Sequence, residues 1–232
     1  MISIIIPVYN MADKIGECLD SIFKQTNQDF EVIMVNDGSS DKFEEKIGPI
    51  LEKLNYSQSV KVFNQVNQGA PSARNHGFKE STGEYLFFCD ADAVLNPEAL
   101  AILLEALNNH PEASYAYPSF MWGKKLFRIG EFNAEKLKAG PCIHTMSLIR
   151  REAFPVNGWD VSIKKLQDWD LYLMMLQENH FGVWVDKVLF NIKPGGNYSS
   201  WLPSFAYKLM PWLPGVKKYN QAMAIVKIKH GL

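Results

Sequence analysis

The first half of the chain alternates between apolar runs and helix-type patterns. Ile2–Val8 is almost entirely apolar, which is typical of a parallel strand buried on both faces. Between Ile15 and Phe23 the apolar residues are spaced three and four apart, as on an amphipathic helix. The repeated alternation predicts a mostly parallel sheet with helices on both faces, joined by right-handed crossovers. The other predicted strands here are Glu31–Asn36, Val60–Phe63 and Tyr85–Cys89, and the other predicted helices are 43–54 with Asp41 as its N-cap, Ala70–Lys79, and one from Asn96-Pro97 to Leu107.

The second half of the chain is less regular. Leu166–Glu178 carries apolar residues along one side and predicts a helix, and Val183–Ile192 predicts a strand. From Pro194 onward Pro, Gly, Trp and Lys dominate, and the pattern predicts no regular element. Two further predicted strands are Ala113–Phe120 and Ile143–Ile149, separated by a stretch around Gly123–Lys138 that we expect to be flexible.

Composition places the chain among ordinary globular proteins. Its 232 residues suit one domain with a modest appendage, and 47% of them are hydrophobic and 21% charged. No apolar run approaches the ~20 residues that a membrane-spanning helix needs, and no basic leader precedes Ile2, so we expect neither an integral membrane protein nor a secretory signal. Cys18, Cys89 and Cys142 show no metal-binding or redox spacing, which favours a reduced, cytoplasmic setting.

Charge is distributed unevenly along the chain. Of its 24 basic residues seven follow Asp186, where there is no acidic residue, so residues 1–186 carry 17 basic and all 25 acidic side chains. Basic and aromatic residues interleave in this tail, a mixture that suits an anionic membrane interface. A subunit contact or a strap over the core explains the tail equally well, whereas no groove-reading or base-stacking motif supports nucleic-acid binding. The tail aromatic residues are Trp201, Phe205, Tyr207, Trp212 and Tyr219.

Polar residues follow three of the predicted strands. They are Pro7–Asn10 after the first strand, Asn36–Asp41 after the second and Asp90–Asp92 after the fourth. Ligands of open parallel sheets bind beyond the carboxyl ends of the strands, so these residues are expected at one ligand-binding edge. The sequence contains neither G-x-G-x-x-G after the first strand nor a P-loop, which excludes the usual dinucleotide-binding and P-loop classes.

The acidic pair Asp90 and Asp92 is the strongest metal-binding candidate. Two carboxylates one residue apart can share a divalent cation, and such hard oxygen ligands suit Mn²⁺ or Mg²⁺ that bridges to a diphosphate. A solvated pair that caps the turn before the Asn96 helix is the alternative. The metal-binding interpretation is favoured because a buried strand, Tyr85–Cys89, delivers both acids to the ligand-binding edge.

Taken together, these motifs resemble those of the family 2 glycosyltransferases, which have the GT-A fold. The resemblance covers residues 1–195 and implies a catalytic domain with a nucleotide-binding half, 1–110, and an acceptor half, 111–195, followed by a basic aromatic extension, 196–232. The matching motifs, in family order, are Ile4–Asn10, Val35–Asp41, Asn67–Gly69 with Ala73–Asn75, Gly83–Asp92 and Gln167–Leu171.

The resemblance also implies an inverting transfer of a sugar from a nucleoside-diphosphate donor to an acceptor hydroxyl. A carboxylate at Asp37 suits the imide N–H of uracil or thymine, so a UDP- or dTDP-sugar is expected. The resemblance implies that Pro7, Val8 and Tyr9 line the base pocket and that Asp37 accepts a hydrogen bond from the base. It implies that Arg74 approaches the diphosphate and that Asp90 contacts the ribose or the water shell of the metal. It also implies that Asp92 is the direct metal ligand and that Asp168 is the catalytic base.

Structural roles compete with several of these functional ones. Asp37 starts a turn-forming Asp-Gly-Ser-Ser segment, and Arg74 suits a surface salt bridge. Asp168 and Asp170 both favour the positive N-terminus of their helix, although the motif makes Asp168 the better candidate for catalysis. Core packing is the alternative for the residues that could otherwise contact the acceptor or the base, namely Tyr9, His144, Trp159 and Trp169.

The chain departs from the family pattern in one loop. Many relatives carry an Arg and a His before Pro or Gly here, whereas this chain has Lys193 before Pro194. Lys193 is a candidate phosphate contact, with an exposed lysine as the alternative. The expected setting is cell-envelope polysaccharide or glycoconjugate synthesis on a glycan or lipid-linked acceptor, in the cytoplasm or at the inner face of the membrane. A nucleotidyltransferase acting on sugar phosphates and a non-catalytic relic that binds sugar nucleotides are the competing functions.

Overall fold

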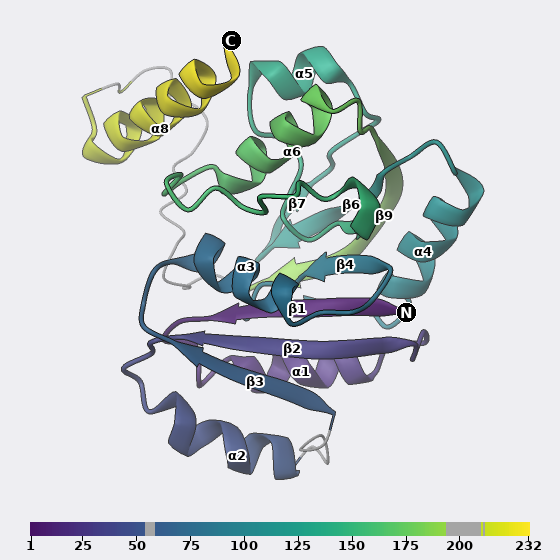
Figure 1. The fold of residues 1–232 in the computed structure, drawn as a ribbon, viewed down its shortest axis with the longest axis vertical. Coiled ribbons are helices and arrows are strands. Elements are labelled where there is room, and N and C mark those ends of the chain that lie inside the picture. Colours follow the sequence, from purple (N-terminus) through teal and green to yellow (C-terminus); the bar gives the residue numbers. More distant parts are fainter. Residues whose placement is uncertain (54–58, 194–209, 211) are drawn as a thin grey trace.

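The protein folds around one nine-stranded sheet flanked by helices (Figure 1). The computed structural model describes residues 1–53, 59–193, 210 and 212–232. Along the sheet the strands follow the order β3-β2-β1-β4-β8-β6-β9-β5, and β7 pairs with β6. The strands are β1 (Ile2–Val8), β2 (Phe30–Asp37), β3 (Val60–Gln65), β4 (Tyr85–Phe88), β5 (Ala93–Leu95), β6 (Tyr115–Trp122), β7 (Lys125–Phe127), β8 (Leu148–Arg150) and β9 (Gly182–Ile192).

The sheet is mostly parallel, as the alternating pattern predicts. β1 lies between β2 and β4 and is parallel to both, and β3 continues this parallel half outward. In the other half β6 and β9 are parallel to each other. The short strands interrupt this regularity, because β8 runs antiparallel to both β4 and β6, β5 to β9, and β7 to β6.

Helices cover both faces of the sheet, which confirms the predicted layering (Figure 1). Alternate residues of β1 serve the two faces: Ile4 packs in one core and Ile5 in the other. Gly77 brings α3 close to β1, since a Cβ at this position would lie 2.5 Å from Cγ2 of Ile5. One face carries α1 (Ile15–Phe23), α2 (Phe43–Lys53) and α4 (Ala99–Asn109); the other carries α3 (Ala70–Lys79), α5 (Ala134–Ala139), α6 (Gln167–Gln177) and α8 (Pro214–His230).

Three expectations for the second half are wrong in part. The stretch around Gly123–Lys138 was expected to be flexible but contains β7 and α5. The strand expected over Ile143–Ile149 is only the short β8. The preceding residues follow local bonds instead: the His144 carbonyl accepts hydrogen bonds from Ser147 Oγ and Tyr172 Oη, both at 3.0 Å. The tail, for which no element was predicted, contains the helix α8.

Asp41 was predicted to cap α2 and does not. Its Oδ2 accepts a hydrogen bond from the backbone N–H of Ala12 at 2.8 Å, so it joins the loop after β2 to the loop after β1. Lys42, directly before α2, has a left-handed backbone with φ of 61°. The carboxylate therefore serves a tertiary contact that the local sequence pattern does not contain.

Two other features of the sequence gain a structural context. Cys18 and Cys89 are 71 residues apart, yet their sulfurs lie 3.7 Å from each other in the core, and all three cysteines are free. Among the described residues no helix combines the length and the apolar character needed to span a bilayer.

Candidate active site

The loops after β1 and β2 are joined into one unit at the carboxyl edge of the sheet. The Asn10 side chain accepts a hydrogen bond from the Ser40 N–H at 2.7 Å, and the Asn10 N–H donates to Ser39 Oγ at 3.0 Å. The bond from Ala12 to Asp41 adds a third link. Two of the three predicted strand ends therefore meet here, as expected for parallel neighbours.

Asp37 lies at the end of β2 and is 1% exposed. Its Oδ1 accepts hydrogen bonds from Gln65 Nε2 at 2.8 Å and from the Gln68 N–H at 2.9 Å, and its Oδ2 accepts one from the Gly69 N–H at 2.8 Å. Asp37 thus holds the loop before α3 in place. Since a carboxylate offers about four acceptor positions, one remains for a ligand.

The three predicted base-pocket residues have different surroundings. Pro7 and Tyr9 keep partial exposure at the end of β1, whereas Val8 is fully buried in the core beneath the sheet. Val8 therefore supports the predicted pocket from below, and its side chain does not reach the surface. The exposed parts of such a pocket come from Pro7 and Tyr9.

Arg74 connects three elements around the predicted metal site. Its Nη2 donates to Asp90 Oδ1 at 3.1 Å and its Nη1 to Gln167 Oε1 at 3.1 Å, while the guanidinium lies 4.7 Å from the ring centre of Trp159. Arg74 is buried, so the surface salt bridge considered as the alternative is not what forms. The guanidinium instead joins α3, the end of β4 and α6, and its approach to a diphosphate stays a prediction.

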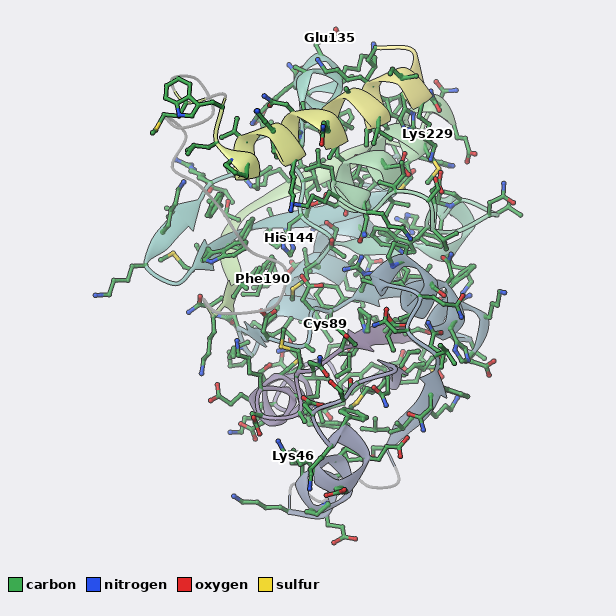
Figure 2. The ribbon with its side chains drawn as sticks, turned by 90° about the vertical axis from the view of Figure 1, so that its left-hand side faces the viewer. Lys46, Cys89, Glu135, His144, Phe190 and Lys229 are labelled. Atoms are coloured by element: carbon green, nitrogen blue, oxygen red, sulfur yellow. The ribbon has the colours of Figure 1, made fainter. Side chains whose placement is uncertain are left out.

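His144 also lies beside Asp90, with its Nε2 3.7 Å from Asp90 Oδ2. Its Nδ1 accepts a hydrogen bond from the Met146 N–H at 3.2 Å, which places the proton of a neutral imidazole on Nε2. Burial lowers the pKa of His144, while the charges of Asp90 and Asp168 act in the opposite direction. Figure 2 shows His144 near Phe190, whose ring centre is 5.2 Å away, so His144 belongs both to an aromatic cluster and to the acidic site.

Asp168 stands in the first turn of α6, as the motif predicts. The residue before this helix, Leu166, has a left-handed backbone with φ of 61°, a conformation that is rare and costly for a residue other than glycine. Burial raises the pKa of Asp168, whereas the neighbouring His144 and Arg74 lower it. Asp168 thus shares one electrostatic environment with Arg74, His144 and Asp90.

Asp92 follows two residues after Asp90 and is half-buried. Burial and the charge of Asp90 raise the pKa of Asp92 to about 6, while Lys14 lowers it. The backbone N–H of Lys193 lies 3.4 Å from the Asp92 carbonyl, and its ammonium pairs with Glu17 of α1. Its predicted phosphate contact therefore competes with an ion pair.

Lys14 is a functional candidate that the sequence analysis missed. Its Nζ is buried and has no hydrogen-bond partner within the described part of the chain. The residue stands at the N-cap of α1, where a positive charge is electrostatically unfavourable. A lysine directly before a helix, close to the predicted nucleotide loop, is the signal in the sequence that could have identified it.

The tryptophans that could have formed an acceptor platform belong to the core. Trp159 and Trp169 are both buried, and Trp169 Nε1 donates to the Leu137 carbonyl at 2.6 Å. Packing, the alternative considered for both, is what the structure contains. Trp201, Phe205 and Tyr207 lie outside the described residues.

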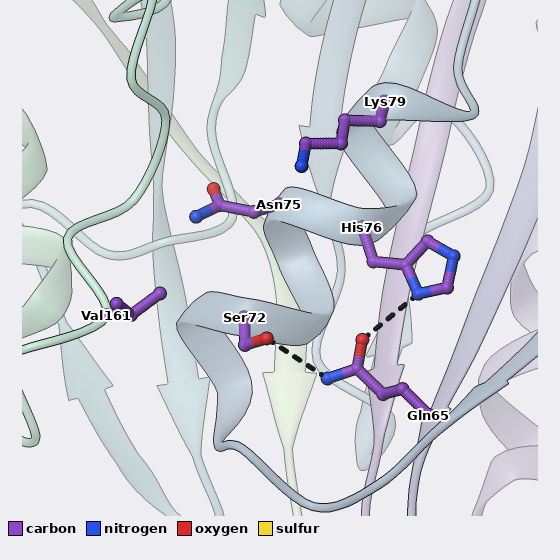
Figure 3. Close-up of a pocket in the computed structure, with 6 residues that line it drawn as sticks. All are labelled: Gln65, Ser72, Asn75, His76, Lys79 and Val161. Carbon is purple, nitrogen blue, oxygen red and sulfur yellow. Dashed lines mark hydrogen bonds between the residues drawn. The ribbon is translucent and has the colours of Figure 1, made fainter.

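A pocket of about 300 Å³ lies beside α3 and is lined by Gln65, Ser72, Asn75, His76, Lys79 and Val161 (Figure 3). Gln65 at its rim accepts a hydrogen bond through Oε1 from His76 Nδ1 at 3.0 Å and donates through Nε2 to Ser72 Oγ at 3.2 Å. None of the predicted site residues lines this pocket. In the part of the chain that the structure describes, Gln65 is the one lining residue that also donates a hydrogen bond to a residue of the predicted nucleotide site, Asp37.

The sequence of the chain matches the family described as "Glycosyl transferase family 2" over residues 3–156. This chain belongs to the family 2 glycosyltransferases. An uncharacterized glycosyltransferase of Haemophilus influenzae is 30% identical over 194 residues, which are 78% of this chain and 64% of the relative. The chain therefore spans less than two thirds of the length of that family member.

Solved structures show the same fold. The structure of S. aureus TarS 1–349 in complex with UDP matches with a TM-score of 0.71 at 20% identity, and the match covers 100% of this chain and 66% of that one. The mannosyltransferase PcManGT from Pyrobaculum calidifontis, in complex with GDP-Man and Mn²⁺, matches with a TM-score of 0.70 at 18% identity and covers 98% and 75% of the two chains. The predicted GT-A fold of this family 2 member is confirmed.

Proposed function

We propose that this chain transfers a sugar from a UDP- or dTDP-sugar to an acceptor hydroxyl, with inversion at the anomeric carbon. One observation carries the proposal: Asp90 from the end of β4, Arg74 from α3 and Asp168 from α6 share one charge cluster. Acids from distant parts of the chain that converge in this way mark a site with strongly perturbed charges. The UDP named for the TarS complex supports a uridine donor.

The donor nucleotide would occupy the edge formed by the loops after β1 and β2. Pro7 and Tyr9 offer surface for the base, and the remaining acceptor position of Asp37 suits an imide N–H. Gln68 and Gly69 already fix the direction of the Asp37 carboxylate, and because it is 1% exposed the base reaches it once the atoms that cover it move aside. Hydrogen bonds from backbone N–H groups to side chains hold the two loops together in advance, which lowers the entropic cost of binding.

A divalent cation fits the acidic pair. Asp92 has a carboxyl whose pKa is raised to about 6 by burial and by Asp90, and such a crowded pair gains from a cation between or beside the carboxylates. Among the described residues no group of three or more His, Cys, Asp or Glu is arranged to hold a metal. Asp92, with Asp90, would therefore hold Mn²⁺ or Mg²⁺ together with donor phosphates and water, and the bound cation would neutralise charge on the departing diphosphate.

Asp168 acts as the base in this proposal. Its carboxylate takes the proton from the acceptor hydroxyl as that oxygen forms a bond to the anomeric carbon. The bond from this carbon to the diphosphate breaks, and its electron pair leaves with the phosphate oxygen. Attack from the face opposite the leaving group inverts the anomeric centre.

Lys14 is the cation that we assign to the donor phosphates. Its ammonium is buried without a hydrogen-bond partner among the residues that the structure describes, and an anionic ligand beside Asp92 would supply one. Lys193 can contribute only by leaving Glu17. The assignment thus gives the chain a substitute for the basic residues that its last loop lacks.

The tail supports a second, separate proposal about location. On α8 the side chains of Ile225 and Ile228 are exposed, Ile228 by 81%, and this helix carries lysines but no acidic residue. We propose that residues 198–232 contact an anionic membrane from the cytoplasmic side, near a glycan or lipid-linked acceptor of envelope polysaccharide synthesis. Co-sedimentation with anionic and with neutral vesicles at low salt tests this, and equal pelleting with both refutes it.

The transferase activity is tested by the products formed from a UDP-sugar and Mn²⁺. Release of UDP, lost in the D92N variant, is expected from the proposed function. Pyrophosphate formed from UTP and a sugar phosphate would instead identify a nucleotidyltransferase, and binding of UDP without either product would identify a non-catalytic relic. The D186N variant, at an exposed carboxylate on β9, is the matched control.

A further inference from the structure

Polar contacts join the last turn of α8 to the first turn of α6. Asp170 of α6 is 1% exposed, although a carboxylate in a first helical turn normally needs only solvent and the helix dipole. Its Oδ1 lies 2.8 Å from Lys229 Nζ and 2.8 Å from His230 Nε2, and both partners come from the end of α8. Figure 2 shows Lys229 at this end of the helix.

These contacts are buried, so they fix the position of the Asp170 carboxylate. The His230 side chain is 3% exposed, and a buried carboxylate that loses its partners is left with an uncompensated charge. Only Trp169 lies between Asp168 and Asp170, so both carboxylates belong to the same first turn. Any movement of Asp170 is therefore transmitted to Asp168 through less than one turn of backbone.

Lys229 also contacts a second segment, the loop that contains Asp160. Its Nζ lies 2.7 Å from Asp160 Oδ2, and this pair, together with hydrogen bonds from Ser162, lowers the pKa of Asp160 to about 2. Asp160 directly follows Trp159, whose ring packs on the guanidinium of Arg74. The same ammonium thus joins α6 to the segment that supports Arg74.

The start of α6 requires such support. Leu166 precedes the helix in a left-handed conformation, and no side chain caps the helix there. Strained backbone of this kind persists only where the surroundings enforce it. The apolar contribution of α8 is small, since among the described residues only Val216, Ala222 and Val226 of this helix are buried, so the ion pairs set how it docks.

We propose that Asp170 is a positioning residue of the transfer reaction. Its ion pair with Lys229 and its hydrogen bond with His230 hold the first turn of α6 so that Asp168 faces Arg74, Asp90 and His144. This inference rests on the proposed role of Asp168 as the base. It assigns to α8 a catalytic support function in addition to any role of its outer face.

The test compares K229M and H230Q with K218M, a change of an exposed lysine on the same helix. In the two tether variants kcat for transfer is expected to fall about tenfold to a hundredfold, because small displacements of a reacting group cost this much. The KM for the donor is expected to stay within about twofold in H230Q, since His230 contacts Asp170 and the nucleotide loops are bonded separately; K229M also frees Asp160 beside the segment that supports Arg74, so its donor KM can rise. K229R keeps the charge and is expected to restore most of the rate, and K218M is expected to behave as the wild type.

Hydrogen exchange supplies a readout that does not depend on activity. The amides of residues 168–172 are expected to exchange faster in K229M and H230Q than in K218M, with no change in β1 and β2. Unchanged exchange and unchanged kcat in folded tether variants would refute the positioning role alone. A wild-type chain without transfer activity would instead refute the proposed function, and faster exchange in its tether variants would leave the structural contact between α8 and α6 standing.

Discussion

Replacing Asp168 by asparagine is expected to separate activity from stability. The carboxylate Oδ1 accepts a hydrogen bond from the Trp169 N–H at 2.9 Å, and an amide oxygen of the same shape can keep it. The substitution removes only the ability to take a proton and the negative charge. The fold around α6 should therefore remain intact in D168N.

The loss of activity follows from the role of a general base. Such a group contributes about 10²- to 10⁴-fold to the rate, which is ~2.7–5.4 kcal/mol of transition-state free energy. The stability of the protein is expected to change in the opposite direction. Because burial raises the pKa of Asp168 in the folded state, ionisation of this carboxyl disfavours folding at neutral pH.

The stability difference should depend on pH with a definite sign. Below the ordinary pKa of an aspartate both folded and unfolded chains are protonated there, so D168N and wild type should melt alike. As pH rises through the raised pKa, only the wild type bears the penalty, and D168N should become the more stable protein. Thermal melts across this range in EDTA, combined with UDP release in Mn²⁺, measure both effects.

Two outcomes would contradict this reasoning. Turnover in D168N within about threefold of wild type would remove Asp168 from the chemistry. A lower melting temperature at neutral pH would mean that the ionised carboxylate stabilises the fold, against its raised pKa. The E178Q variant, at the exposed end of the same helix, should change neither property.

Three further predictions address the metal, the phosphates and the packing. Since the pKa of Asp92 is about 6, Mn²⁺ affinity measured calorimetrically without nucleotide should fall about tenfold per pH unit below that value, and a flat profile would count against Asp92 as a ligand. K14M should weaken UDP binding about tenfold or more without lowering the melting temperature, and unchanged affinity would remove Lys14 from the phosphate site. G77A should lower the free energy of unfolding in urea by ~1–2 kcal/mol, because the new Cβ would lie 2.5 Å from Ile5. The control G48A in α2, whose Cβ would meet no described atom within 4 Å, should leave stability unchanged or raise it. Equal effects of the two substitutions would contradict the close packing of α3.

The sequence predicts the parallel half of the fold because its signals are local. β1 is a continuous apolar run, and α3 shows both its boundaries and its first-turn proline in the sequence. β5 and β7 have three residues each and exist through their pairing with β9 and β6, which no local pattern contains. α8 was missed because its buried side is narrow and its other sides mix lysine with isoleucine.

For the candidate site, too, the sequence predicts what depends on local signals and misses what depends on distant partners. The motif places Asp90, Asp92 and Asp168 because each follows or opens a recognisable element. The burial of Asp170 was not predictable, since its partners stand 59 and 60 residues later on a helix without a sequence signal. Likewise, Lys14 stands out only once the structure shows its ammonium buried, with no hydrogen-bond partner from residues 1–53, 59–193, 210 and 212–232.

The hydrogen bonds that join Asn10 to Ser39 and Ser40 have a consequence for engineering. Donor preference in such a protein invites the transplantation of a single loop from a relative with a different nucleotide. Here a foreign segment after β1 would lose partners that belong to the segment after β2, and the reverse exchange would fail in the same way. A chimera has to exchange 9–12 and 37–41 together, as one cassette.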